Sequence, residues 1–128
     1  MRKTVSTPKA PKAIGPYSQA VKIDAPQSLM FVSGQIPMDP ETGELVQHTF
    51  EAEVERVLEN VKAVVEEGGF QMSDVVKATV YLTDMADFVA MNQVYMRYFD
   101  GECPARAAFA VKGLPKGARV EIEVVCAR

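Results

Sequence analysis

Residues 49–69, with the sequence TFEAEVERVLENVKAVVEEGG, decide the fold. Apolar side chains recur in this stretch at the spacing of one helical face: Val54, Val57, Leu58, Val61, Val64 and Val65. Thr49 is a suitable N-cap, glutamates crowd the first turns, and Gly68 and Gly69 stop the pattern. The valines lower the helix propensity, but the periodicity outweighs them and predicts one long amphipathic helix.

The chain beyond this helix predicts a strand, a second helix and two further strands. Residues 73–82 have the β-branched and aromatic content of a strand. Asp84 can cap a second helix over residues 85–99, whose apolar stripe we interpret as core packing. Residues 107–112 and 119–126 predict two closing strands, joined by a turn that contains glycine and proline.

Two more strands precede the first helix, at residues 18–23 and 29–33, with a polar turn between them. Strands and helices in this order predict an α+β fold, in which two helices pack on one face of a mixed sheet. The length of 128 residues suits a single domain that spans residues 1–128. Adjacent valines at 75–76 and 124–125 put apolar side chains on both faces of the sheet. We therefore expect another copy of the chain to bury the second face.

Composition argues against several classes of function. The formal net charge of -3 disfavours nucleic-acid binding, which needs a basic surface. No apolar run approaches the roughly 20 residues that cross a bilayer, and residues 1–12 lack the apolar core of a signal peptide, so we expect a cytoplasmic protein. His48 is the one histidine, and Cys103 and Cys126 fit no metal spacing, so we expect no metal site.

Two charged residues on the closing strands are candidates for chemistry. Arg106 shares its strand face with two alanines, which leaves room for a small molecule, and an arginine fork binds a carboxylate through two hydrogen bonds. Glu121 faces away from the apolar residues of its strand and can act as a general acid or base if a subunit boundary partly buries it. From the residues alone, a surface arginine paired with a glutamate, and a glutamate that is solvated or paired with Lys77 or Lys112, are simpler interpretations.

Three further positions are candidate pocket residues. Tyr17 follows Gly15 and Pro16, which fix a tight chain path and aim the phenol in one direction. Ser33 and Gly34 end a predicted strand, where hydroxyl and backbone N–H groups can bind a ligand. Asn92 interrupts an apolar helix and needs hydrogen-bond partners if it is buried. Each position also has a purely structural interpretation: Tyr17 as an anchor for the N-terminal segment, Ser33 and Gly34 as a turn, and Asn92 as an internal tie.

The chain as a whole resembles the RidA family, also called YjgF-type proteins. The stretches that carry the resemblance follow one another in the family's order: AIGPYSQA (13–20), FVSGQIP (31–37), NVKAV (60–64), VKATVYL (76–82), PARAA (104–108) and LPKGARVEIE (114–123). The last two stretches are the most specific. Together the stretches cover nearly the entire chain.

The resemblance implies a chorismate-mutase-like α+β fold, assembled as a homotrimer with active sites between subunits. It implies hydrolysis of 2-iminopropanoate and 2-iminobutanoate, products of serine and threonine dehydratases, to 2-oxo acids and ammonia without a metal or organic cofactor. Its partners are other copies of the chain and small imino or 2-oxo acids, with no nucleic acid and no membrane.

Family motifs also imply roles for single residues. Arg106 resembles the arginine that clamps the substrate carboxylate, and Glu121 resembles the acid that handles the water and the proton transfers. The resemblance assigns the remaining pocket positions to Tyr17, Ser33, Gly34, Asn92, Ala107 and Ala108. Many family members have a cysteine where this chain has Ala108, a departure that removes a reactive thiol but keeps the backbone groups.

Other functions stay open beside this one. A non-catalytic trimer would bind a 2-oxo acid or an amino acid in the same cleft without turning it over. Replacing Glu121 by glutamine distinguishes the two functions, because binding alone should survive the change and turnover should not. A ribonuclease needs a basic stripe or paired histidines, which the sequence lacks. Chorismate mutase activity rests on fold analogy alone.

Overall fold

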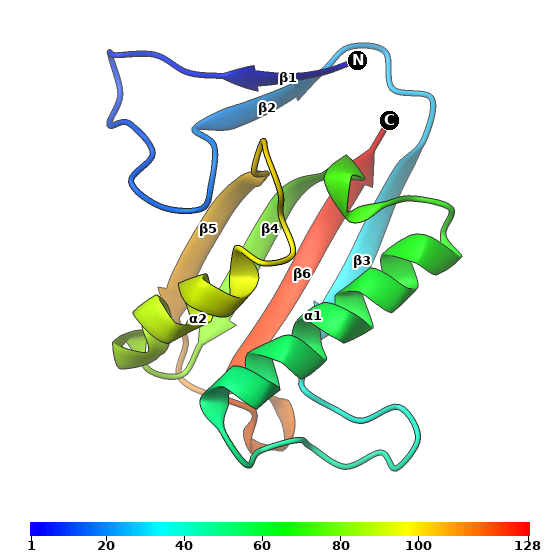
Figure 1. The fold of residues 1–128 in the computed structure, drawn as a ribbon, viewed down its shortest axis with the longest axis vertical. Coiled ribbons are helices and arrows are strands. Elements are labelled where there is room, and N and C mark those ends of the chain that lie inside the picture. The colour runs from blue at the N-terminus through cyan, green and yellow to red at the C-terminus, as the bar shows by residue number, and fades with distance from the viewer.

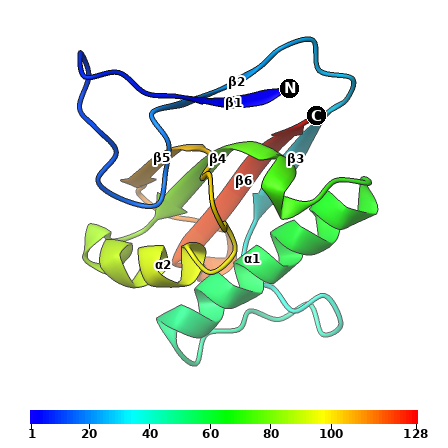
Figure 2. The same ribbon diagram turned by 45° about the horizontal axis from the view of Figure 1, so that its top comes forward.

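The computed structural model, which describes residues 1–128, is built on a four-stranded mixed sheet (Figure 1). β4 (Val75–Leu82) and β5 (Ala105–Ala110) run parallel, whereas β6 (Val120–Ala127) is antiparallel to both β3 (Leu29–Gln35) and β4. Two helices, α1 (Phe50–Glu67) and α2 (Phe88–Tyr95), cover the same face of this sheet (Figure 2). The predicted α+β fold is therefore confirmed. The strands follow one another across the sheet in the order β3, β6, β4 and β5.

Helix α1, Phe50–Glu67, begins and ends where the sequence predicts. The Thr49 hydroxyl accepts a hydrogen bond from the Ala52 backbone N–H at 3.0 Å. Gly69 has a φ of 83°, a left-handed conformation that glycine adopts without strain just past a helix end. The helix packs over β3 and β6. Val64, part of the predicted stripe, is an exception because its side chain is 40% exposed.

Helix α2, Phe88–Tyr95, is shorter than the predicted helix over residues 85–99. Met85–Asp87 form a 3₁₀ turn instead, capped by the Asp84 carboxylate, which accepts from the Ala86 N–H at 2.9 Å. Beyond Tyr95 the chain leaves the helix, and the Phe99 ring packs 4.5 Å from the Tyr95 ring between centroids. The helix ends because the backbone N–H groups of Arg97 and Tyr98 bond to carbonyls three residues back, at Val94 and Tyr95, while the apolar stripe itself is core, as predicted.

The core lies between the sheet and the two helices. Strand β6 shows how the sequence builds it, because its residues alternate in burial. Val120, Ile122 and Val124 are buried under the helices, as predicted. Glu121 and Glu123 lie on the opposite face of the sheet, where each is half-buried.

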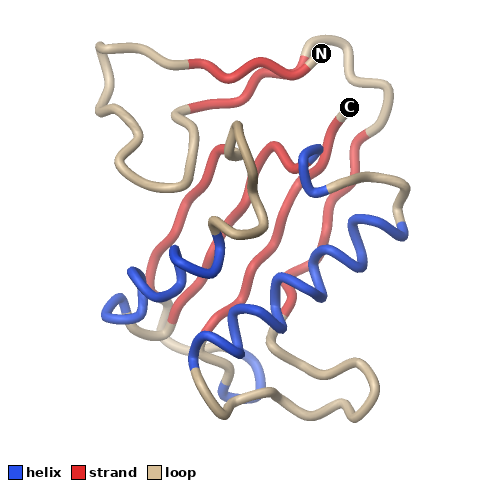
Figure 3. The backbone as a smooth tube through the Cα atoms, in the orientation of Figure 1, coloured by secondary structure: helices blue, strands red, loops and turns tan.

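The N-terminal segment differs from the prediction. Arg2–Val5 form an unpredicted strand, β1, which pairs with β2 (Ala20–Ile23) in a separate two-stranded sheet (Figure 3). The strands predicted at 18–23 and 29–33 do not pair with each other, since β2 pairs with β1 and β3 pairs with β6. The Arg2 guanidinium fixes the position of β1 by donating to the Ser73 and Val75 carbonyls at 3.0 and 2.7 Å, a long-range tie that local pattern does not reveal.

Two strand boundaries also shift. Residues 72–74 form a 3₁₀ turn, so β4 starts at Val75 instead of residue 73. The strand predicted at 107–112 is β5, which runs from Ala105 to Ala110. β5 and β6 are joined along the chain but do not pair, because β4 lies between them.

The sheet face opposite the helices is uncovered in the single chain (Figure 2). Large apolar side chains on it reach water, with Leu29 56%, Phe31 75% and Phe109 44% exposed. Val125 lies on the same face, because it pairs with Phe31, as the valine pair at 124–125 predicts. At the other valine pair the register of β4 is irregular, between Val75 and Lys77. Neither helix is long and apolar enough to span a lipid bilayer.

Candidate functional site

Arg106 lies on β5, the edge strand, on the face that carries the helices. Its register partner on β4 is Ala78, a fully buried core residue, so the Arg106 side chain starts toward α2. One guanidinium nitrogen, Nη1, donates to the Asn92 Oδ1 atom at 2.7 Å. Asn92 is held by α2, and this bond is the internal tie that its position in an apolar helix predicts.

Three aromatic rings surround the Arg106 guanidinium. Its Cζ atom lies 4.9 Å from the ring centroid of Tyr95 and 5.6 Å from those of Tyr17 and Phe88. Phe88, Asn92 and Tyr95 come from one face of α2, at a spacing of three to four residues. The rings make a slot that holds the planar guanidinium in one orientation.

The Arg106 charge has no counterion within the chain, since every salt bridge lies elsewhere. Burial lowers the pKa of Arg106, and Tyr95, Tyr17 and Cys103 act in the opposite direction. An arginine remains protonated in proteins. A half-buried cation without a carboxylate partner is a candidate anion-binding group, and a surface arginine paired with a glutamate is not what the structure contains.

Tyr17 reaches this slot because the N-terminal segment crosses the edge of β5. The Tyr17 N–H donates to the Gly15 carbonyl at 2.8 Å, which makes the tight path predicted for Gly15 and Pro16. Next to it, the Ser18 N–H donates to the Pro104 carbonyl at 3.1 Å, and its hydroxyl donates to the Cys103 carbonyl at 2.5 Å. The segment thus anchors the tyrosine beside the arginine.

Ser33, Gly34 and Glu121 form a second group, near a bulge of β3. Val32 pairs with Val124 and Gln35 with Ile122, so Ser33 and Gly34 together oppose the single residue Glu123. The Glu121 carboxylate lies over Gly34, because a Cβ atom built on that glycine would stand 1.9 Å from Glu121 Oε2. Only glycine leaves room for this carboxylate.

Two further polar groups share the sheet face with Glu121. Tyr81, its register partner on β4, donates its hydroxyl proton to Glu123 Oε1 at 2.5 Å. The hydrogen bond to Glu123 raises the pKa of Tyr81, with a smaller contribution from the Glu121 charge. The predicted alternative for Glu121, an ion pair with Lys77 or Lys112, does not form.

The two groups stay apart within one chain. Arg106 belongs to the β5 edge and to the helix-covered face, whereas Gly34 belongs to the β3 edge and Glu121 to the opposite face (Figure 1). Alternation along β5 also separates the two predicted alanines, since Ala108 packs against the core and Ala107 faces the other way. The structure therefore unites Tyr17, Asn92 and Arg106, and separately Ser33, Gly34 and Glu121.

Two residues of the arginine slot, Phe88 and Tyr95, are absent from the sequence-based site. Their signal was the helical spacing to Asn92, which put one polar and two aromatic side chains on one face. Tyr95 is fully buried, and its hydroxyl has no hydrogen-bond partner within the chain. Such an unpaired buried hydroxyl is uncommon and marks this slot as more than ordinary core.

Neither cysteine has the environment of a reactive thiol. Both Cys103 and Cys126 are free. Burial raises the pKa of Cys103, although Arg106 and Arg2 partly oppose the shift. Burial also raises the pKa of Cys126 to about 11. The structure contains no cluster of three or more histidine, cysteine, aspartate or glutamate side chains that could hold a metal ion.

Comparison with known proteins identifies the family. The family model described as endoribonuclease L-PSP matches residues 7–128. The chain belongs to this family, which includes the YjgF and RidA proteins. Both the predicted family and the predicted fold class are thereby confirmed.

Three family members illustrate the range of names. The mouse protein named 2-iminobutanoate/2-iminopropanoate deaminase is 46% identical over 125 residues, which cover 98% of this chain and 90% of the mouse protein. The structure of RidA from a Psychrobacter species has a TM-score of 0.76 at 46% identity, covering 98% and 99% of the two chains. The structure of Escherichia coli TdcF with bound serine has a TM-score of 0.76 at 41% identity and covers 98% of each chain.

Proposed function

We propose that this family member hydrolyses the C=N bond of short 2-imino acids, chiefly 2-iminopropanoate and 2-iminobutanoate, to 2-oxo acids and ammonia. The observation that carries the proposal is the half-buried Arg106 guanidinium, held by Asn92 and aromatic rings and left without a carboxylate partner. A 2-imino acid supplies the missing carboxylate. The name of the mouse relative supports the same substrate class.

The proposed site forms between copies of the chain in a homotrimer. The two groups of site residues lie at different edges and faces of one sheet, so a single chain does not complete the site. A head-to-tail contact, which brings the arginine slot of one copy to the Glu121 carboxylate of the next, closes into a ring under cyclic symmetry. Such a ring also covers the apolar sheet face around Phe31 and Phe109.

Each group has a role in the proposed reaction. Arg106 binds the substrate carboxylate bidentately, and the surrounding rings exclude water from this pair. The imine carbon is electrophilic, so the site needs mainly to orient water and move protons. Glu121 takes a proton from the attacking water and delivers it to the imine nitrogen, which gives a carbinolamine. It then moves the hydroxyl proton of this intermediate to the same nitrogen, so that the C–N bond breaks, ammonia leaves and the carbonyl forms. Ser33 and the backbone at Gly34 orient the substrate beside this carboxylate.

The test is an imine hydrolysis assay. A threonine dehydratase generates 2-iminobutanoate in the cuvette, and formation of 2-oxobutanoate is compared with and without this protein. We expect a rate above that of buffer alone, and Glu121→Gln should remove the acceleration. An unchanged rate with the folded parent protein would overturn the proposed activity.

The alternative is a trimer that binds an amino acid or a 2-oxo acid without turnover. The bound serine in the TdcF structure favours this alternative for that relative. Calorimetric binding of serine or 2-oxobutanoate, together with no imine hydrolysis, would select it. The free thiols of Cys103 and Cys126 support our placing the protein in a reducing compartment such as the cytoplasm.

A further inference from the structure

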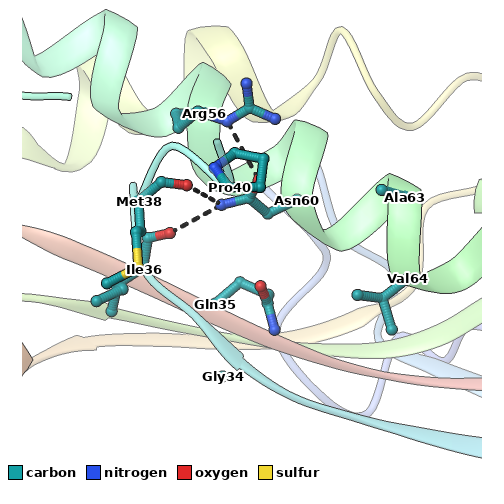
Figure 4. A pocket seen from close by; sticks show the side chains of 9 residues that line it. All are labelled: Gly34, Gln35, Ile36, Met38, Pro40, Arg56, Asn60, Ala63 and Val64. Atoms are coloured by element: carbon teal, nitrogen blue, oxygen red, sulfur yellow. Dashed lines mark hydrogen bonds between the residues drawn. The ribbon is translucent and has the colours of Figure 1, made fainter. Parts of the chain in front are cut away.

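A groove beside the proposed active site, with which it shares Gly34, lies between the end of β3, the loop that follows it and helix α1 (Figure 4). Its volume is about 330 Å³, within the range of small-ligand pockets. The walls are mainly apolar, and Val64, 40% exposed, belongs to them. The residues that line the groove include Gln35, Ile36, Met38, Asn60, Ala63 and Val64.

Arg56 is the one charged residue that lines this groove. Its Nε atom donates to Asn60 Oδ1 at 3.1 Å. The Asn60 amide in turn donates to the Ile36 and Met38 carbonyls at 3.1 and 2.9 Å, which ties the loop to α1 (Figure 4). The network holds the inner part of the guanidinium in place and leaves its two outer nitrogens, Nη1 and Nη2, without a hydrogen-bond acceptor from the chain.

The acidic residues near Arg56 do not neutralise it. Arg56 forms no salt bridge, although Glu55 and Glu59 lie within three residues along the helix. Glu59 accepts a hydrogen bond from the Tyr98 hydroxyl at 2.7 Å, and the buried Glu53 is paired with Arg119. The outer edge of the Arg56 guanidinium is therefore free to bind an anion.

We propose that this groove is a second binding site, for a short aliphatic carboxylate, with Arg56 as the group that binds the carboxylate. The aliphatic body of the ligand lies against Ala63 and Val64, where apolar surface is otherwise left in water. The proposal goes beyond the proposed imine hydrolysis, since Arg106 and its aromatic slot take no part in it.

Most of the groove lies away from the sheet face that the proposed trimer covers, and only its edge at Gly34 adjoins the proposed contact with the next copy. The groove lies beside α1, in the helix layer (Figure 4). The apolar residues that a second copy covers, Phe31 and Phe109 among them, lie on the other face of the sheet. A trimer assembled through that face would leave Arg56, on α1, accessible to a small molecule.

The probe for this site is pentanoate, which combines one carboxylate with an unbranched aliphatic chain. Met38 lines the groove, whereas Met91 is fully buried in the core, so the two methyl groups serve as reporter and reference. Pentanoate is titrated into protein labelled with ¹³C at its methionine methyl groups. We expect a saturable shift of the Met38 resonance and none from 1-pentanol or pentylammonium at equal concentration.

Matched variants identify the anchor. Arg56→Gln should weaken binding about ten- to a hundred-fold, because it removes charge-assisted hydrogen bonds. Lys62→Gln removes a positive charge from the same helix outside the groove and should leave the affinity unchanged. Ala63→Leu keeps Arg56 but fills the groove, so it should abolish the Met38 shift even if Arg56→Gln folds poorly.

Two results would overturn the proposal: no saturable Met38 shift, or parent-like affinity in both Arg56→Gln and Ala63→Leu. Binding at the proposed active site is separated by Arg106→Ala, which should leave the Met38 response intact. A Met38 response that disappears in Arg106→Ala would assign the probe to the Arg106 slot and would also overturn the second site. Loss of imine hydrolysis alone has no bearing on it.

Discussion

Replacing Gly34 with alanine should displace the Glu121 carboxylate although no charged residue is mutated. The new Cβ atom would stand 1.9 Å from Glu121 Oε2 and 2.9 Å from its Cδ atom, whereas ordinary van der Waals contact begins at 3.4 Å. The oxygen must therefore retreat by the difference of 3.4 and 1.9 Å, about 1.5 Å. Because a carboxylate ends a flexible side chain, it can yield by changing its rotamer, at a cost of roughly 0.5–1.5 kcal/mol.

The catalytic consequence should be much larger than the structural one. A misplacement of about 1 Å in a reacting group can lower the rate on the order of 100-fold, and we expect such a loss in kcat for Gly34→Ala. KM should change less, because Arg106 still binds the substrate carboxylate. Steady-state hydrolysis of 2-iminobutanoate measures both parameters, and thermal unfolding followed by circular dichroism measures stability. Gly113→Ala is the matched control, since nothing lies within 4 Å of its built Cβ atom.

A double-mutant cycle makes the argument specific to Glu121. If alanine at position 34 acts by moving this carboxylate, Gly34→Ala should cause little further loss in the Glu121→Gln background. Parent-like turnover by folded, trimeric Gly34→Ala would refute the reasoning, because the Glu121 carboxylate could then move by more than an ångström without effect. Equal losses from Gly34→Ala with and without the Glu121 carboxylate would refute it too.

The remaining predictions concern the anion slot, the assembly, the thiols and a buried ion pair. Arg106→Ala should lose at least one to two decades of turnover, since a hydrogen bond to a charged group contributes about 1.5–3 kcal/mol. Arg106→Lys should also be impaired, because an ammonium lacks the planar fork of a guanidinium. Near-parent hydrolysis by the folded alanine variant would show that Arg106 is not part of the site. Light scattering should find three chains per particle, and a stable monomer at micromolar concentration would contradict the shared site. Burial holds the pKa of Cys103 above its ordinary value of 9.0, so its thiol is protonated at neutral pH. Labelling by iodoacetamide should therefore be slow at neutral pH, speed up as the pH rises toward that pKa, and leave turnover intact. Inhibition that substrate prevents would contradict this prediction. Arg119→Ala should lower the free energy of unfolding by about 3 kcal/mol in urea denaturation, because it leaves the fully buried Glu53 carboxylate without its cation; a loss below about 1 kcal/mol, the range of exposed pairs, would show the pair to be dispensable.

Local pattern was sufficient wherever a short-range rule governed the structure. The period of the valines and the Thr49 and Gly69 caps defined α1, because helix hydrogen bonds and caps join residues only a few positions apart. Side-chain alternation along β6 put Glu121 on the other face of the sheet from Ile122, because it depends only on neighbouring residues of one strand. The family motifs around Arg106 and Glu121 are each one continuous stretch of the chain, so they were recognisable before any fold was known.

Long-range packing decided what the pattern missed. The strand predicted at 29–33 pairs with β6, which lies almost a hundred residues further along the chain, and the strand predicted at 18–23 pairs with the N-terminal β1. The unpredicted strand β1 depends on the hydrogen bonds of Arg2 to carbonyls near residue 74. None of these contacts leaves a periodic trace in the sequence.

The sequence by itself determined the fold class, the family and the identity of the charged residues, because each rests on residue types and short spacings. Only the tertiary structure decided that Arg106 and Glu121 occupy opposite faces of one sheet, that Phe88 and Tyr95 complete the arginine slot, and that Gly34 makes room for Glu121. The physical reasons are strand order, which puts β6 and β4 between the two edge strands, and side-chain alternation along β5 and β6, which sends Arg106 and Glu121 to opposite faces.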